Sequence, residues 1–321
     1  MSYNLVLQEK FQELHQAYFK RAPKTLYEPI SYAMESGGKY IRPLLLIYAH
    51  ELFNGKIDDV ILNAYGMELF HNFTLVHDDI MDNSDVRRGK ETVYKKFGLN
   101  SGILSGDFMF IISLQLACKV NGQTNSELFD LVSETAIKIH EGQQMDVDFE
   151  SMERVPEEDY IKMIEYKTAV LLACSLQMGG FMANASKEDQ AHLYEFGRFL
   201  GIAFQIQDDY LDSFGDAQLG KRIGGDILNN KKTLLFIASL ERANDEEKQE
   251  LLKLYSTKDG NEADKITAVK RIFESSGGKA YCDQQMKDYV SASLESLYSI
   301  KTNNSKEELL KIADTVIKRK K

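Results

Sequence analysis

Apolar residues recur at helical spacing along nearly the whole chain, and this pattern restricts the possible folds more than any other feature. One stripe runs from Ile61 to Val76 and another from Leu193 to Ala203. Strand-like alternation is hard to find, and only 4 prolines interrupt 321 residues. Because helices with wide apolar faces must bury them against one another, the pattern predicts an all-α bundle of roughly ten or more helices around a central cavity. We expect one domain over residues 1–321, with helix boundaries at glycine pairs such as Gly37-Gly38 and Gly179-Gly180.

Charge and cysteine content argue against several functional classes. The 39 Lys and Arg residues against 49 Asp and Glu residues give a net charge of -10, which is unfavourable for binding nucleic acid. The 3 cysteines are too few for a disulfide framework. No unbroken apolar run approaches the roughly 20 residues of a membrane span, so we expect a soluble, cytoplasmic protein without stable membrane insertion. Such an acidic protein would bind an anionic substrate poorly unless metal ions intervened.

Two matching acidic motifs are the strongest chemical signal. Residues 78–82 read Asp-Asp-Ile-Met-Asp and residues 208–212 read Asp-Asp-Tyr-Leu-Asp, each at the end of an apolar stripe. The first and fifth carboxylates of a motif lie about 40° apart on one helical face, so they repel each other unless a cation lies between them. Oxygen ligands suit Mg²⁺, which also shares phosphate oxygens with a substrate. The expected metal ligands are Asp78, Asp82, Asp208 and Asp212.

Basic residues lie near these acids at expected helix ends. Gly37-Gly38 can end one helix and a nearby proline can start the next, which would place Lys39 and Arg42 at a helix N-terminus that favours phosphate. His71 lies two turns before the first acidic motif on nearly the same face, so it is within reach of a substrate. The remaining candidate cations are Arg87, Arg88, Lys167, Lys221 and Lys231.

Two patterns that suggest other sites fail on their details. Gly215 to Lys221 has the spacing of a nucleotide-binding P-loop, but Arg222 replaces the required Ser or Thr, and a helix rather than a strand is expected before it. His71 and His77 are six residues apart, which does not match the helical His-x-x-x-His pair of zinc sites. We therefore expect neither a nucleotide nor zinc.

In this order the motifs resemble those of the trans-isoprenyl diphosphate synthases, or polyprenyl synthetases, from about Gly37 to the C-terminus. The matching segments are Gly-Gly-Lys-x-x-Arg-Pro at 37–43, His71 to Asp82 with Arg87-Arg88-Gly89, Gly106-Asp107, Lys167-Thr168, Phe204 to Asp212, Gly220-Lys221, Gly225-Asp226-Ile227 and Asn230-Lys231. Two details depart from the family pattern. Lys90-Glu91-Thr92 and Tyr94 stand where Pro and His are common, and Arg222 resembles a one-residue insertion. Neither removes an expected ligand.

The resemblance implies an isoprenoid synthase-like helical fold, a homodimer and a reaction. The reaction is the Mg²⁺-dependent head-to-tail condensation of isopentenyl diphosphate with an allylic diphosphate, giving a short all-trans prenyl diphosphate of fifteen to twenty carbons. Three Mg²⁺ ions on the acidic motifs would hold the allylic diphosphate. The residues expected to assist on that diphosphate are Arg87, Lys167, Lys221 and Lys231. Thr168 and Gln205 would stabilise the allylic cation, and isopentenyl diphosphate would be held by Lys39, Arg42, His71 and Arg88.

Phe73 is the expected determinant of product length. It lies five residues before Asp78, and so about 7.5 Å deeper along the helix, where its ring would block a growing chain. Thr74, one residue nearer the acids, is too small to do so. In the family, an aromatic residue at this offset accompanies short products. The competing interpretation is an ordinary core phenylalanine on the stripe from Ile61 to Val76.

Two other functions remain as alternatives. A class I terpene cyclase is also helical and Mg²⁺-dependent, but its second motif usually carries Asn/Ser/Glu or Asp/Thr/Glu ligands instead of a repeated acidic motif. A non-catalytic regulatory subunit of a heteromeric prenyl synthase would be marked by loss of the second motif, which is intact here. The basic run from Lys318 to Lys321 is expected to be a solvated tail, although the resemblance allows it to fold over the substrate phosphates.

Overall fold

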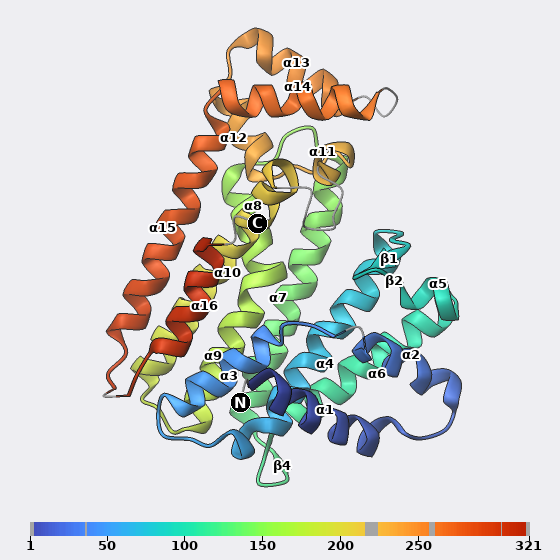
Figure 1. Cartoon of the computed structure of the whole chain (residues 1–321), viewed down its shortest axis with the longest axis vertical. Helices are drawn as coiled ribbons and strands as arrows, with labels where there is room; N and C mark the ends of the chain where they lie inside the picture. Colours follow the sequence, from blue (N-terminus) through green and yellow to red (C-terminus); the bar gives the residue numbers. More distant parts are fainter. Residues whose placement is uncertain (1–2, 36, 216–223, 257–260, 303, 319–321) are drawn as a thin grey trace. The chain divides into compact units, whose positions relative to one another are not determined.

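The computed structural model describes residues 3–35, 37–215, 224–256, 261–302 and 304–318, and most of these residues are helical (Figure 1). The predicted all-α class is therefore confirmed. The chain divides into two compact units. The first unit comprises residues 1–134 with 174–190, and the second comprises residues 135–173 with 191–321.

The first unit contains helices and two short antiparallel hairpins. Its helices are α1 (Tyr3–Phe19), α2 (Lys24–Glu35), α3 (Ile41–Glu51), α4 (Ile57–Met81), α5 (Val93–Phe97) and α6 (Leu99–Ala117). The hairpins pair β1 (Val86–Arg87) with β2 (Lys90–Glu91), and β3 (Lys119–Val120) with β4 (Gln123–Thr124). Three further helices contribute residues to both units: α7 (Ser126–Ser151), α9 (Val170–Met182) and α10 (Lys187–Phe214).

Close packing of α4 against α6 holds the helix that leads to the first acidic motif. A Cβ atom on Gly66 would come within 2.5 Å of the backbone nitrogen of Ala117, so only glycine permits this approach. The buried Asn63 amide donates to the carbonyl oxygens of Ala117 and Lys119 at 2.7 and 2.9 Å, which satisfies the end of α6. Both contacts hold α4 against α6, and α4 carries the first acidic motif at its C-terminal end.

The second unit is built from the remaining helices. They are α8 (Glu157–Ile164), the π-helical turn η1 (Glu165–Ala169), α11 (Gly225–Leu228), α12 (Leu234–Arg242), α13 (Asp245–Ser256), α14 (Glu262–Ser275), α15 (Gly278–Ser299) and α16 (Glu307–Lys318). Their core is a single cluster of buried apolar side chains that includes Tyr160, Phe236 and Phe273.

Two glycines bring helices α7 and α10 against η1. A Cβ on Gly142 of α7 would lie 2.4 Å from the backbone nitrogen of Lys167, and one on Gly201 of α10 would lie 2.5 Å from the Cα of Ala169. Single π-turns inside helices occur frequently at functional sites. Here the turn carries Lys167 and Thr168, two of the predicted site residues.

The predicted helix boundaries are partly right. Gly37 has a left-handed φ of 66° two residues after α2, as expected for the end of a helix. The boundary predicted at Gly179-Gly180 is wrong, because α9 continues to Met182. A Cβ on Gly179 would lie 2.2 Å from the carbonyl oxygen of Leu46, so this glycine serves helix packing rather than chain reversal.

Helix α6 qualifies the expectation about membrane spans. It is the one helix among the described residues that is long and apolar enough to cross a membrane by length and composition, with a mean hydropathy of 1.2 over its most apolar stretch. This helix contains no long unbroken apolar run, because polar residues such as Ser105 and Asp107 interrupt it. Its mean hydropathy nevertheless remains high. Core helices of globular proteins pass the same test, and α6 packs along α4.

Candidate active site

The first acidic motif has the predicted geometry. Helix α4 ends at Met81, and Asp82 follows as its C-cap, with its N–H donating to the carbonyl oxygen of Asp78 at 2.8 Å. The first and fifth acids are therefore one helical turn apart. The middle acid, Asp79, is buried and accepts a hydrogen bond from Arg87 Nε at 2.7 Å. Burial raises the pKa of Asp79, and the charge of Arg87 opposes this rise. The hydrogen bond between the two residues connects the β1–β2 hairpin, which carries Arg87, to α4.

Basic residues predicted to bind a diphosphate gather around the buried Glu68. Arg42 is the second residue of α3, and burial lowers its pKa to about 10 while the charge of Glu68 opposes that shift. The carboxylate of Glu68 also accepts a hydrogen bond from Asn72 at 3.1 Å. The guanidinium of Arg88 donates to the carbonyl oxygen of Gly37. The loop before α3 and the β1–β2 turn thus meet beside α4.

The remaining two members of this group lie on the same elements. Lys39 is exposed just before α3, whose N-cap residue Tyr40 has a left-handed φ of 50°. Burial, followed by the charges of Arg42, Arg88 and Arg87, holds the pKa of His71 well below its usual value. His71 is therefore neutral at pH 7 and can act as a hydrogen-bonding group rather than as a cation. The buried Nε of Arg42 has no hydrogen-bond partner among the described residues, as expected where an anionic ligand supplies one.

Phe73 lies in an aromatic cluster. Its side chain is 3% exposed, and its ring centroid lies 4.9 Å from those of both Phe70 on α4 and Phe110 on α6, and 5.9 Å from that of His77. Thr74 donates through its hydroxyl to a backbone carbonyl of its own helix. A cluster of this kind fits a wall that limits a growing chain, and it also fits a core, so the assignment of Phe73 to product length stays a prediction.

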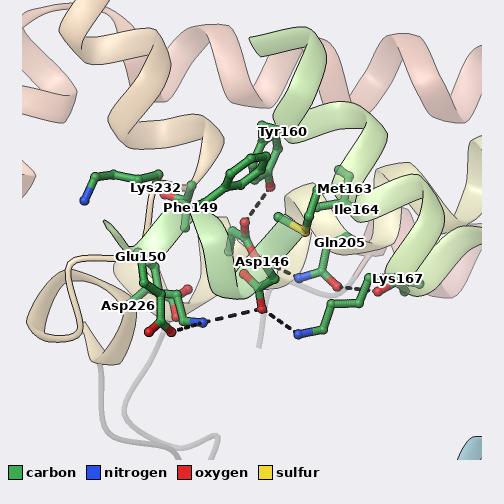
Figure 2. A pocket seen from close by; sticks show the side chains of 14 residues that line it. Asp146, Phe149, Glu150, Tyr160, Met163, Ile164, Lys167, Gln205, Asp226 and Lys232 are labelled. Carbon is green, nitrogen blue, oxygen red and sulfur yellow. Dashed lines mark hydrogen bonds and ion pairs between the residues drawn. The ribbon is translucent and has the colours of Figure 1, made fainter. Parts of the chain in front are cut away.

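The second unit contains a cavity of about 190 Å³, shown in Figure 2. On its wall, Asp146 of α7 lies 2.6 Å from Lys167 Nζ and 3.5 Å from Lys231 Nζ. Lys231 also pairs with Glu150 at 3.3 Å. Burial by itself would raise the pKa of Asp146, but the two lysines outweigh burial and lower it below its ordinary range. The two cations predicted to bind the same diphosphate are thus brought together by a carboxylate that sequence reasoning missed.

A chain of hydrogen bonds runs behind these lysines. The Thr168 hydroxyl donates to Gln205 Oε1 at 3.2 Å, and Gln205 Nε2 donates to Asp209 Oδ1 at 2.8 Å. The Tyr160 hydroxyl donates to the other oxygen of Asp209 at 2.5 Å. Burial raises the pKa of Asp209 to about 7, against the lowering effect of both hydrogen bonds. All four side chains line the cavity.

The second acidic motif lies in the last turns of α10. Asp212 Oδ2 accepts the backbone N–H of Asp226 at 2.9 Å, and the Asp212 carbonyl accepts the N–H of Gly224 at 2.7 Å. Asp212 therefore also anchors the start of α11, while Asp226 lines the cavity. Lys221 and residues 319–321 of the basic tail lie outside the described residues.

The donor set fits Mg²⁺. Within the part of the chain that the structure describes, no three His, Cys, Asp or Glu side chains form a ready-made metal cluster. Mg²⁺ does not require one, because it usually binds through one or two carboxylates, several waters and substrate phosphates. Pairs of acids one turn apart, such as Asp78 with Asp82, supply the oxygen ligands that this ion prefers.

Sequence reasoning missed residues whose partners are distant in the chain. Asp146 pairs with Lys167 and Lys231, 21 and 85 positions away, and Tyr160 pairs with Asp209, 49 positions away. One available signal was the spacing of Asp146 and Glu150, which repeats the one-turn spacing of the acidic motifs on a third helix.

Comparison with known proteins decides the family. The family model described as Polyprenyl synthetase matches residues 23–273, a range that contains both acidic motifs and the cavity residues. The chain belongs to the polyprenyl synthetase family. It is a prenyltransferase, as the sequence motifs predicted.

The chain is similar to several prenyl diphosphate synthases over nearly its full length. It is 36% identical over 300 residues to a short chain isoprenyl diphosphate synthase of Methanothermobacter thermautotrophicus, covering 92% of this chain and 91% of that protein. It is 39% identical over 305 residues to a geranylgeranyl diphosphate synthase of Saccharolobus solfataricus, covering 93% and 91%. A crystal structure of a geranylgeranyl pyrophosphate synthase matches with a TM-score of 0.90 and 38% identity, covering 98% of both chains.

Proposed function

We propose that this chain condenses isopentenyl diphosphate head-to-tail with an allylic diphosphate, in a Mg²⁺-dependent reaction of isoprenoid biosynthesis. The product is a short all-trans prenyl diphosphate of fifteen to twenty carbons. The observation that carries the proposal is the cavity of the second unit, where Lys167 and Lys231 meet beside the neutral dipoles of Thr168 and Gln205. Prenyl transfer requires, among other groups, cations for a diphosphate and dipoles for a carbocation.

The groups that would hold the allylic diphosphate are basic side chains and the carboxylates that would bind Mg²⁺. Asp78 and Asp82 in the first unit, and Asp208 and Asp212 in the second, are the proposed Mg²⁺ ligands. When bound, three Mg²⁺ ions would offset the charge of the acidic residues and stabilise the departing pyrophosphate as Lewis acids. Lys167 and Lys231, which pair with Asp146 on the cavity wall, supply positive charge for the diphosphate oxygens. Arg87, which Asp79 orients, assists on the same diphosphate. Lys221 is proposed for the same diphosphate from its sequence motif alone.

Isopentenyl diphosphate occupies the basic group of the first unit. Lys39 and Arg42 flank the N-terminus of α3, where backbone N–H groups add to their charge. Arg88 approaches from the β1–β2 turn, and neutral His71 donates a hydrogen bond. The double bond of this substrate attacks the allylic cation, and the released pyrophosphate accepts the proton.

The cation needs stabilisation without a nucleophile. The carbonyl oxygen of Gln205 and the hydroxyl oxygen of Thr168 present the negative ends of neutral dipoles to the cavity, and these dipoles stabilise a cation without carrying the full negative charge of a carboxylate. Apolar lining residues, among them Phe149, Met163 and Ile164, exclude water that would quench the cation.

The proposed assembly is a cytoplasmic homodimer of a single polyprenyl synthetase domain over residues 1–321. Helix α6 supports it, because Ile103, Leu104 and Ile111 are large apolar side chains that are 41%, 60% and 53% exposed. Leu104 and Ile111 are seven residues apart and so lie on one face. A second copy covering this face would bury apolar area that is costly to leave in water. Sedimentation analysis should give twice the chain mass, and Leu104→Lys should give the monomer.

The function is tested by incubating the full chain with Mg²⁺, labelled isopentenyl diphosphate and each allylic primer in turn, then sizing the labelled product. We expect incorporation of isopentenyl units and release of pyrophosphate. Consumption of the allylic diphosphate without isopentenyl diphosphate, giving a cyclic hydrocarbon, would indicate a terpene cyclase. Absence of product with every primer would contradict catalysis by this chain alone.

A further inference from the structure

We propose that Tyr160 is a positioning residue for prenyl transfer: through Asp209 its hydroxyl sets the direction of the Gln205 amide, and so the polarity that Gln205 and Thr168 present to the cavity. The inference rests on the proposed function. Figure 2 shows Tyr160 on the cavity wall, with its hydroxyl hydrogen-bonded to Asp209.

The donor and acceptor atoms in this chain give the direction of each hydrogen bond. In the structure both carboxyl oxygens of Asp209 accept a hydrogen bond. Tyr160 supplies one from its hydroxyl at 2.5 Å and Gln205 supplies the other from Nε2 at 2.8 Å. The amide nitrogen of Gln205 thus points to Asp209, and its carbonyl oxygen points the other way, toward the Thr168 hydroxyl at 3.2 Å.

This direction matters because the opposite one would oppose catalysis. With the amide reversed, the positive N–H groups of Gln205 would lie on the side of Thr168, where a cation is to be stabilised. The Thr168 hydroxyl would then accept a hydrogen bond and turn its own proton toward the cavity. Because Asp209 is buried, its carboxyl group orients Gln205 more firmly when its second oxygen also has a hydrogen-bond partner.

Tyr160 is suited to this task by its burial. It lies in the first half of α8, is 1% exposed and packs in the apolar core of the second unit. Its ring therefore cannot swing to another partner, and its single rotatable proton is committed to Asp209. A buried hydroxyl fixed by the core gives Asp209 one orientation, and Asp209 transmits it to Gln205 and Thr168.

The test is a double-mutant cycle on the full-length enzyme. Tyr160→Phe removes only the hydroxyl, and Thr168→Val removes the group at the far end of the chain. We expect Tyr160→Phe to lower kcat by about ten- to a hundredfold while the KM for either substrate changes by less than about threefold, because only the cation is affected. If the hydroxyl acts through Thr168, Tyr160→Phe should cost much less in the Thr168→Val background than in the wild type.

The matched control is Tyr281→Phe. Its hydroxyl donates to Glu157 on the same helix α8 at 2.7 Å but does not join the chain to Thr168. We expect wild-type kcat for it. Three results would each overturn the positioning role: an unchanged kcat in Tyr160→Phe, rate losses that multiply in the double mutant, or unfolding of Tyr160→Phe. In all three cases, activity of the wild type would leave the proposed function standing. An inactive wild type would overturn both.

Discussion

Replacing Asp146 with asparagine removes the charge shared by Lys167 and Lys231 while it preserves the shape of the side chain. Loss of one member of a buried ion pair costs about 3–5 kcal/mol, whereas exposed pairs contribute about 0–1 kcal/mol. The Asp146 side chain is 15% exposed and each lysine is 24% exposed, so the site lies near the buried limit. The asparagine oxygen still accepts a hydrogen bond from Lys167, which offsets part of the loss. We therefore expect Asp146→Asn to lower the free energy of unfolding by about 2–3 kcal/mol at pH 7.

Glu150 provides a control on the same lysine. It pairs with Lys231 at 3.3 Å, but its side chain is 57% exposed, so Glu150→Gln should cost less than about 1 kcal/mol. Urea unfolding followed by far-UV circular dichroism suits a chain with no tryptophan. Hydrogen exchange at the amides of η1 should show the same difference locally.

The pH dependence gives a second test of the same pair. The pKa of Asp146 is lowered in the folded state, so its stabilisation is fully present above the ordinary Asp pKa of about 3.9 and is lost as pH falls through the lower folded value. The difference in the free energy of unfolding between wild type and Asp146→Asn should thus stay constant from about pH 8 to pH 5 and shrink only below about pH 4. Two results would refute a buried ion pair at Asp146. One is that Asp146→Asn lowers the free energy of unfolding no more than Glu150→Gln does. The other is that the stability difference between wild type and Asp146→Asn already shrinks between pH 7 and pH 5.

Three further predictions follow from the packing and charge of the site. Lys39→Ala or Arg42→Ala should raise the KM for isopentenyl diphosphate far more than that for the allylic primer, because both flank the N-terminus of α3; equal effects on the two substrates would contradict separate sites. Phe73→Ala should lengthen the product by one or more five-carbon units with catalysis retained, because it removes a ring from the aromatic cluster; an unchanged product distribution would leave Phe73 as a core residue. Gly201→Ala should destabilise the protein by about 1–3 kcal/mol in thermal unfolding, because its Cβ would lie 2.5 Å from the Cα of Ala169. An unfolding temperature equal to that of the wild type would show that α10 and η1 can move apart to accept the methyl group.

Local sequence patterns predicted the features that depend on neighbours along the chain. The apolar stripe from Ile61 to Val76 became α4, and the one-turn spacing of Asp78 and Asp82 follows from helical periodicity alone. The N-terminus of α3 beside Lys39 and Arg42 was predictable because glycine and proline act on their own segment.

Features that depend on distant contacts were not predictable from such patterns. Nothing near Asp146 in the sequence indicates that two lysines from later elements converge on it. The π-turn that carries Lys167 and Thr168 likewise depends on the close approach of Gly142 and Gly201 from two other helices. The failed boundary at Gly179 has the same origin, because a glycine required for packing cannot be told from one that ends a helix without knowing its neighbour.

The central claim is that both acidic motifs supply Mg²⁺ ligands for prenyl transfer by this chain. The most direct test is the initial rate of labelled isopentenyl incorporation at saturating Mg²⁺ for wild type, Asp78→Asn and Asp208→Asn, with circular dichroism as a check on folding. Loss of one charged ligand should cost several kcal/mol of transition-state stabilisation, and each 1.36 kcal/mol is tenfold in rate, so each variant should lose about a thousandfold or more with its helical content unchanged. Near wild-type turnover in either folded variant would contradict the account.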